Sequence, residues 1–257
     1  MSNPGPSGTP SVEGEASAAD AEAPRQIKRI LLKLSGESLG VNGTGVSPKV
    51  VKDIAEQIAR VHRLGVEIAI VCGAGNLLRG AEFAKMGTNR ATADHMGMLG
   101  TAINALALQD GLERAGVETR AACAVEMKTV AEPYIRRRVI RHLEKGRCVV
   151  LAGGTGNPYF TTDTAAALRA TELGVDAIFK ATKVDGVYTA DPKKDPTATK
   201  FDRLTFREAL DRDLQVMDRT AFTLCMENDM PIMVFDMFAA GNMERAVRGE
   251  AIGTWVV

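Results

Sequence analysis

Two lysines, Lys33 and Lys180, each stand at the end of a short apolar run and open a turn that contains glycine (residues 33–37 and 180–186). Two more polar turns, residues 73–76 and 153–162, also follow apolar runs. Glycine lets main-chain N–H groups approach an anion, and a following helix N-terminus adds partial positive charge. Four such turns, two of them with lysine, indicate a site for more than one phosphorylated ligand.

Phosphoryl transfer needs cations against the transferred group, rigid main-chain donors, and a carboxylate that orients a lysine or holds Mg²⁺. Arg79 lies just past the second glycine turn, and Asp163 begins a predicted helix. The sequence has no GxxxxGK[ST] motif, and Leu78 stands where a dinucleotide fingerprint has its third glycine. The sequence therefore predicts phosphoryl transfer by an enzyme that has neither a P-loop nor a Rossmann-type NAD site.

Strands alternate with helices along the chain, and this order determines where the turns lie. Apolar runs predict strands over residues 30–34, 66–72, 117–125, 147–152, 176–180 and 232–235, with a last strand near Trp255. Helical patterns predict one helix that begins at Pro48 and others over residues 91–115, 134–145, 163–174 and 217–228. A further short helix is predicted to contain Glu208. The fold class is α/β: an open, mainly parallel sheet with helices on both faces and the four turns at its carboxyl edge.

Charge and composition exclude several classes of protein. The 257 residues carry 32 Lys and Arg against 32 Asp and Glu, which argues against a general nucleic-acid or membrane-surface binder. Residues 1–25 are rich in Pro, Gly, Ser and Ala, hold four acidic residues, and are predicted to form a disordered acidic tail. Residues 25–257 hold 28 acidic against 32 basic residues and are mildly basic.

The remaining compositional features point to a cytoplasmic protein. No segment has the ~20 consecutive apolar residues that span a bilayer, and the N-terminus lacks a signal-peptide pattern. The four cysteines form no CxxC pair, and three of them fall in apolar runs, so they are predicted to be buried and to bind no zinc.

Six segments together closely resemble the bacterial UMP kinase (uridylate kinase) family of the amino acid kinase superfamily. They are ILLKLSGE (30–37), CGAGNLLRG (72–80), DHMGML (94–99), GTGNPYFTTDTA (154–165), KATKVDGVYTADP (180–192) and VMDRTAFTL (216–224). The resemblance covers about residues 27–257 and implies a three-layer α/β sandwich. It implies one kinase domain over residues 26–257, with a UMP-binding part at about 26–175 and an ATP-binding part at about 176–257. The implied reaction transfers the γ-phosphoryl group of ATP-Mg to UMP and gives UDP and ADP.

The resemblance assigns residues to the reacting centre and to ATP. The implied catalytic residues are Lys33, Arg79, Asp163 and Lys180. The implied ATP-binding residues are Lys33, Leu34, Ser35, Gly36, Gly75, Arg79, Thr182, Tyr188 and Asp191, with Tyr188 as a packing face for adenine. Asp163 is assigned to lysine orientation or Mg²⁺ and not to proton abstraction, because a second phosphate pKa near 6 leaves UMP largely ionised.

For UMP, the implied binding residues are Ala74, Asp94, Thr155, Gly156, Asn157, Pro158, Tyr159, Phe160, Thr161 and Thr162. Asp94 is expected to hydrogen-bond the ribose, the alternative being a helix N-terminal aspartate. Either Tyr159 or Phe160 is expected to pack on the base. Ala74 replaces the usual glycine, which is tolerated at negative φ but forces the loop to shift if positive φ is needed.

Metal, effectors and assembly complete the implied picture. Mg²⁺ arrives with ATP, with Asp163 or Asp218 as candidate ligands, although Asp218 is equally a candidate helix cap. GTP activation and UTP inhibition are expected, but residues 40–46 differ from the family's glycine-rich stretch. A homohexamer is expected. The cationic run of Arg136, Arg137, Arg138 and Arg141 is interpreted as a solvated or inter-subunit helix face rather than an effector or nucleic-acid patch.

Two other classes of function stay open on the sequence. One is a nucleotide or oxyanion binding and storage protein on the same scaffold, although retention of four candidate catalytic residues disfavours it. The other is a nucleic-acid-responsive regulator, which would be a second role added to the kinase.

Overall fold

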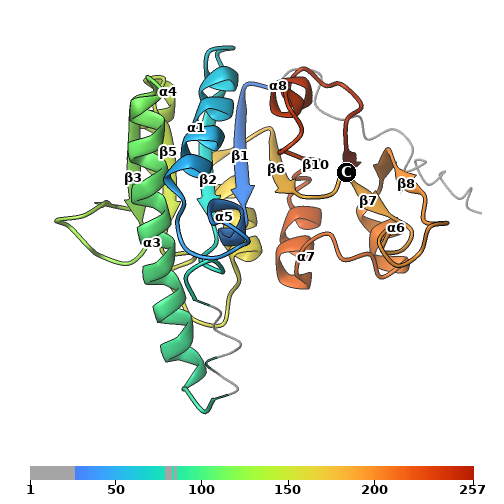
Figure 1. Ribbon diagram of the computed structural model, residues 1–257, viewed down its shortest axis with the longest axis horizontal. Coiled ribbons are helices and arrows are strands. Elements are labelled where there is room, and N and C mark those ends of the chain that lie inside the picture. The colour runs from blue at the N-terminus through green and yellow to red at the C-terminus, as the bar shows by residue number, and fades with distance from the viewer. Residues whose placement is uncertain (1–26, 79–82, 84–85) are drawn as a thin grey trace, which may run out of the picture.

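A nine-stranded sheet forms the centre of the molecule, in the computed structural model that describes residues 27–78, 83 and 86–257 (Figure 1). The strand order is β4-β3-β5-β2-β1-β6-β10-β11-β9. Every neighbouring pair is parallel except β10 and β11, so the predicted open, mainly parallel α/β sheet is confirmed. The strands are β1 (Arg29–Leu34), β2 (Glu67–Cys72), β3 (Thr119–Cys123), β4 (Glu132–Pro133), β5 (Cys148–Ala152), β6 (Ala177–Thr182), β9 (Arg203–Leu204), β10 (Ile232–Asp236) and β11 (Thr254–Val256).

Helices cover both faces of this sheet. One face packs against α1 (Pro48–His62), α3 (Arg90–Arg114) and α8 (Asn242–Val247). The other packs against α4 (Arg136–Glu144), α5 (Thr162–Leu173), α6 (Phe206–Asp211) and α7 (Arg219–Glu227). Along β1, Ile30 and Leu32 point into the first core and Leu31 into the second, as expected for a parallel strand that is covered on both sides.

Local signals in the sequence explain where the main helices begin and end. The Ser47 side chain accepts a hydrogen bond from the main-chain N–H of Val50, and Pro48 occupies the first turn of α1, as predicted. Thr161 caps α5 in the same way, and that helix ends at Gly174 in the left-handed conformation. These caps fix the point at which each helix leaves the carboxyl edge of the sheet.

The sequence did not predict the two-residue strands β4 and β9, or the small hairpin of β7 (Val187–Tyr188) and β8 (Lys200–Phe201). A pair of residues carries no measurable periodicity, so only tertiary pairing defines these strands. The short 3₁₀ helix η2 (Gly36–Leu39) after β1 was also not predicted. The four cysteines are buried, as expected. No helix among residues 27–78 and 86–257 is long and apolar enough to span a membrane.

Candidate functional site

The four polar turns come together because their strands are adjacent. β5, β2, β1 and β6 are consecutive in the sheet and parallel, so their carboxyl ends share one edge. The turns after them are the four that the sequence singled out. The N-terminal part of α3 extends past this edge and forms one wall of the region (Figure 1).

Two lysines and one carboxylate form the centre of the edge. Lys33 of β1 and Lys180 of β6 are direct partners in the strand register, so both point to the face that α5 covers. Asp163, in the first turn of α5, contacts both: its Oδ1 lies 2.6 Å from Lys33 Nζ, and its Oδ2 lies 2.9 Å from Lys180 Nζ. Lys180 also donates to the main-chain oxygen of Val216.

Burial and neighbouring charges together shift the pKa values of Asp163 and Lys180. The three side chains are only 12%, 16% and 16% exposed. Burial alone would raise the pKa of Asp163, but the ammonium groups of Lys33 and Lys180 outweigh it and hold that pKa below its ordinary value. Burial lowers the pKa of Lys180, and the negative charge of Asp163 partly offsets this. The carboxylate therefore stays ionised and keeps two cations together at a strand edge.

The turns after β1 and β2 are packed main chain against main chain. A Cβ atom added to Gly36 would lie 2.4 Å from the nitrogen of Gly75, so this approach requires glycine. Ala74 is absent from the residues with positive φ, and the conformation that alanine tolerates is the one present. The main chains of the two turns are therefore in direct contact, three residues after Lys33.

Helix α3 holds two of the turns with buried polar side chains. Asn104 donates to the main-chain oxygen of Gly73 (2.7 Å) and exchanges amide hydrogen bonds with Asn76 (2.8 and 3.0 Å). Thr101 accepts from the main-chain N–H of Gly153 (2.8 Å). Buried polar groups with satisfied partners fix conformation strongly, so α3 sets the position of the turns after β2 and β5.

A cavity of about 580 Å³ lies between α3 and the turns. The residues predicted for UMP that line it are Ala74, Asp94, Thr155, Asn157, Phe160, Thr161 and Thr162. Gly75, which was predicted for ATP, lines it as well. Phe160 and not Tyr159 faces the cavity, which places Phe160 where a base could pack. The structure thus brings most of the predicted UMP residues to one hollow beside the lysines.

Asp94 lies inside α3 and not at its N-terminus, where the cap is Asn89. Its carboxylate accepts from Arg90 Nε (2.9 Å) and from the main-chain N–H of Tyr159 (2.7 Å). Tyr159 has a φ of 73°, a conformation that is uncommon for a residue with a side chain. Asp94 therefore joins α3 to the 153–162 loop at a strained position.

Asp218 is a helix cap, which is one of the two roles that the sequence allowed for it. It caps α7 by accepting from the main-chain N–H of Ala221 (3.0 Å), and its carboxylate also accepts from the hydroxyls of Thr161 and Thr164 (3.0 Å for Thr164). Its negative charge raises the pKa of Lys180 slightly. Asp218 thus ties the start of α7 to the start of α5.

The predicted ATP residues lie around the ends of β1 and β6, and their side chains make contacts within the chain. Leu34 is fully buried in the core, so any contact with a nucleotide would come from its main chain. Thr182 donates to the main-chain oxygens of Val184 (2.5 Å) and Phe235 (3.2 Å). Tyr188 is half-buried and donates to Asp185 (2.6 Å), while Asp191 accepts from the main-chain N–H of Lys193 (3.0 Å). Ser35 is the N-cap residue of η2.

Arg79, the fourth predicted catalytic residue, and the 1–25 tail lie outside the described residues. Among the residues that the structure describes, no group of three or more His, Cys, Asp or Glu side chains is arranged to hold a metal ion. Both oxygens of Asp163 already contact lysines, and those of Asp218 contact threonines and a main-chain N–H. The two candidate Mg²⁺ ligands are therefore already engaged by other groups of the chain.

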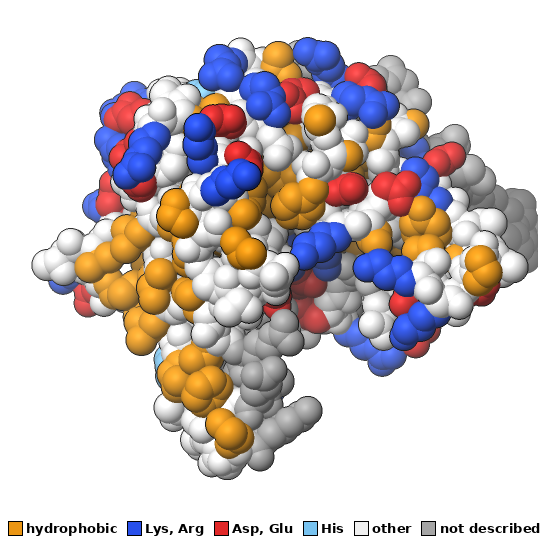
Figure 2. Space-filling view, in the orientation of Figure 1, with side chains coloured by type: hydrophobic (Ala, Val, Ile, Leu, Met, Phe, Trp, Pro, Cys, Tyr) orange, Lys and Arg blue, Asp and Glu red, His pale blue; other side chains and the backbone are white. Residues whose placement is uncertain are grey.

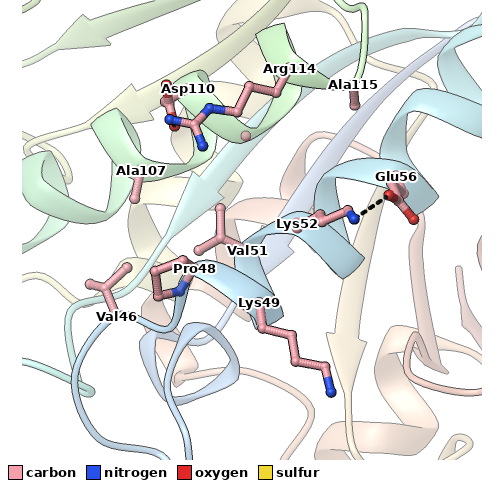
Figure 3. A pocket seen from close by; sticks show the side chains of 11 residues that line it. Val46, Pro48, Lys49, Val51, Lys52, Glu56, Ala107, Asp110, Arg114 and Ala115 are labelled. Atoms are coloured by element: carbon pink, nitrogen blue, oxygen red, sulfur yellow. Dashed lines mark ion pairs between the residues drawn. The ribbon is translucent and has the colours of Figure 1, made fainter.

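Residues 40–46 form a strap that is fastened to the second glycine turn. Gly45 donates to the main-chain oxygen of Asn76 (2.8 Å) and accepts from its side chain (2.7 Å). Val46, at the end of the strap, lines a separate cavity of about 520 Å³ between α1 and α3 (Figure 3). Two of the three cations that line it are paired within the chain, Lys52 with Glu56 (3.8 Å) and Arg114 with Asp110 (3.0 Å). Lys33, Asp163 and Lys180, the predicted catalytic residues that the structure describes, do not line this cavity.

The arginine run of α4 also has partners within the chain. Arg136 donates to the main-chain oxygen of Glu172, Arg138 lies 3.8 Å from Glu132, and Arg141 lies 3.3 Å from Glu144. These side chains remain exposed on the outer surface of α4.

Sequence reasoning missed several residues of the site. Arg90 lines the cavity and pairs with Asp94; its position four residues before an aspartate on a helix was a signal that could have found it. Thr101, Asn104 and Arg169 also contact the turns, but buried polar residues within a helix carry no sequence signature of their partners.

Fold and site together define an α/β protein that gathers cations and glycine turns at one sheet edge and has no P-loop motif in its sequence. The chain belongs to the amino acid kinase family, whose sequence model matches residues 28–236.

Three solved structures show the same architecture. UMP kinase from Bacillus anthracis is 39% identical, with a TM-score of 0.87 over 90% of this chain and 96% of that one. UMP kinase from Ureaplasma parvum is 34% identical, with a TM-score of 0.85 over 90% and 99% of the two chains. Uridylate kinase from Archaeoglobus fulgidus is 28% identical, with a TM-score of 0.68 over 89% and 99%.

Proposed function

We propose that this protein is a UMP kinase that transfers the γ-phosphoryl group of ATP-Mg to UMP and gives UDP and ADP. The observation that carries the proposal is the register pair Lys33 and Lys180, held by Asp163, beside a cavity lined by Asp94, Asn157 and Phe160. The similarity to structures of UMP kinases at 39% and 34% identity supports the choice of acceptor.

In the proposed reaction an oxygen of the UMP phosphate attacks the γ-phosphorus of ATP, and the bond to the bridging oxygen of the β-phosphate breaks. The two lysines neutralise charge on the transferred group, and Arg79 is proposed to do the same. Asp163 keeps both ammonium groups in place. No proton need be removed, because a second phosphate pKa near 6 leaves the attacking oxygen ionised at neutral pH.

The two nucleotides are proposed to lie on either side of this centre. UMP would occupy the cavity, with Asp94 accepting from the ribose hydroxyls and Phe160 packing on the base. ATP would lie over the ends of β1 and β6, with its phosphates at the turns that contain Gly36 and Gly75, and with Mg²⁺ carried on those phosphates.

Homohexamer assembly, a cytoplasmic location, GTP activation and UTP inhibition are part of the proposal. An apolar stripe on α3 supports assembly: Leu99, Ile103 and Leu106 are 49%, 54% and 38% exposed, and Figure 2 shows hydrophobic side chains gathered over this helix. Side chains at such spacing share one face of a helix. Exposed apolar patches of this kind mark interaction surfaces.

A coupled assay of ADP release tests the function. The purified protein with ATP-Mg should turn over UMP, and CMP and AMP only poorly, with rates compared with and without GTP and UTP. Turnover that favours acetylglutamate, carbamate or aspartate would assign the chain to another kinase of the family. Binding of nucleotides without ADP release would instead indicate a storage protein. Light scattering of the wild type and of Ile103→Lys tests the assembly.

A further inference from the structure

Arg169 is a buried arginine behind the loop that forms one wall of the cavity. It lies in α5, six residues after Asp163, and only 6% of its surface is exposed. Nη1 donates to Glu172 Oε2 (2.7 Å), and Nη2 donates to the main-chain oxygens of Gly154 (3.3 Å) and Thr155 (3.4 Å). A buried charge is costly unless it is paired, so these contacts hold the guanidinium in one place.

Two further side chains fix the orientation of this guanidinium. Its central carbon lies 3.9 Å from the ring centroid of Tyr134, a cation–π contact. The Tyr134 hydroxyl donates to Glu172 (2.5 Å), so Arg169 and Tyr134 share one carboxylate. Burial and this hydrogen bond raise the pKa of Tyr134, which keeps the hydroxyl protonated as a donor. The arginine is therefore pre-oriented before any ligand binds.

The two carbonyls that Arg169 contacts begin a loop with unusual conformational freedom. Gly153, Gly154 and Gly156 all have positive φ (76°, 58° and 83°). Glycine reaches these conformations easily but reaches many others as well, so the sequence alone does not select the one observed. Within the loop, Gly156 donates to Gly153 (2.9 Å). Charge-assisted bonds from a fixed guanidinium supply the missing constraint from outside.

We propose that Arg169 is a positioning residue for the acceptor nucleotide. It holds the main chain of Gly154 and Thr155 so that Thr155, Asn157 and Phe160 face the cavity. This inference rests on the proposed function, which places UMP there. Because Arg169 does not line the cavity or contact the two lysines, its loss should weaken UMP binding and leave the ATP side and the chemical step nearly intact.

Steady-state kinetics of Arg169→Lys test the proposal. Lysine keeps the positive charge but lacks the planar fork that reaches Glu172 and both carbonyls together. The loss of one charged hydrogen bond predicts a rise of roughly ten- to a hundredfold in the KM for UMP. The KM for ATP should stay within about twofold and kcat within about threefold. Arg141→Lys on the exposed face of α4 is the matched control and should behave as wild type.

A second variant guards against loss of folding. Tyr134→Phe keeps the ring under the guanidinium and removes only the hydroxyl that meets Glu172, so the core stays filled. It should raise the KM for UMP by about two- to fivefold, because the lost hydrogen bond to the Glu172 carboxylate acts on the loop only through Arg169. Hydrogen exchange of the amides in residues 155–162 should speed up in both variants while the amides of β5 stay protected.

The outcomes separate this inference from the proposed function. If the wild type does not turn over UMP, the proposed function fails. If the wild type is active and both variants keep its KM for UMP and its exchange rates, Arg169 has only a structural role and the inference is overturned. Lower thermal stability with an unchanged KM in the folded fraction has the same meaning.

Discussion

Replacing Asp163 with asparagine should leave two buried ammonium groups side by side without the carboxylate that contacts both. Lys33 and Lys180 are register partners on neighbouring strands, which run about 4.8 Å apart. Breaking a buried ion pair by removing one partner costs about 3–5 kcal/mol. Because the side chains involved are at most 16% exposed, screening by solvent reduces this little. We therefore expect Asp163→Asn to lower the free energy of unfolding by about 3–5 kcal/mol near pH 7.

The pH dependence of this loss follows from the signs of the two pKa shifts. Asp163 has a folded pKa below its ordinary value, so its contribution is present above the unfolded pKa and is lost as pH falls through the folded one. Lys180 has a folded pKa below 10.5, so stability rises with pH between the folded value and 10.5. Without Asp163 the pKa of Lys180 falls further. The variant should therefore recover stability as pH rises from 7 to 10.

Urea unfolding at pH 6, 7, 8, 9 and 10, followed by circular dichroism, measures this difference. Asp110→Asn is the matched control, because Asp110 is 61% exposed and pairs with Arg114 on the surface of α3. That variant should lose about 1 kcal/mol or less at every pH. An Asp163→Asn protein within 1 kcal/mol of wild type at pH 7, or a loss that stays constant up to pH 10, would refute the electrostatic account of the cluster.

Three further predictions concern the site and the core. Asp94→Asn should raise the KM for UMP about tenfold with little change in kcat, whereas Asp163→Asn should lower kcat by about a hundredfold or more. Initial-rate kinetics measure both effects. The reverse pattern would mean that the two carboxylates have exchanged roles. Gly36→Ala should lower the free energy of unfolding by about 1–3 kcal/mol, since its Cβ would lie 2.4 Å from the Gly75 nitrogen. Gly97→Ala is the control, because a Cβ at that position meets nothing within 4 Å. Equal urea midpoints for the two variants would contradict the packing argument. Burial raises the pKa of three of the four thiols to about 12, so a thiol-reactive dye should label them only after unfolding, and fast labelling of the native protein would show that the core opens.

The central sheet could be predicted because its strands are continuous apolar runs. Residues 30–34 and 66–72 carry this pattern, and the polar turns at their ends mark the edge where ligands bind. The sequence could also locate Lys33, Lys180 and Asp163, since each stands at the end of a strand or the start of a helix. That the lysines are register partners was beyond sequence analysis, because register depends on how β1 and β6 pair across the fold.

The second layer of the site could not be predicted, for a related reason. Asn104, Thr101 and Arg169 act through main-chain atoms of distant turns, and a main-chain partner leaves no trace in the residue type. Asp218 is a different case, because its residue type did indicate a helix cap. The same carboxylate caps the helix and accepts from neighbouring threonines. Pattern analysis therefore identified the groups proposed to do chemistry but not those that hold them.

The pairing of Lys33 with Lys180 also connects the site to folding. The two residues are about 150 positions apart in the chain, so the two-lysine cluster exists only once β1 and β6 have joined. A phosphate that contacts both lysines binds only molecules in which β1 and β6 are paired. It therefore lowers the population of molecules in which the two strands are separated by the factor 1 + [L]/Kd. Proteases that act on opened molecules would then remove the protein more slowly when nucleotides are abundant, so ligand supply would set the protein's lifetime as well as its rate.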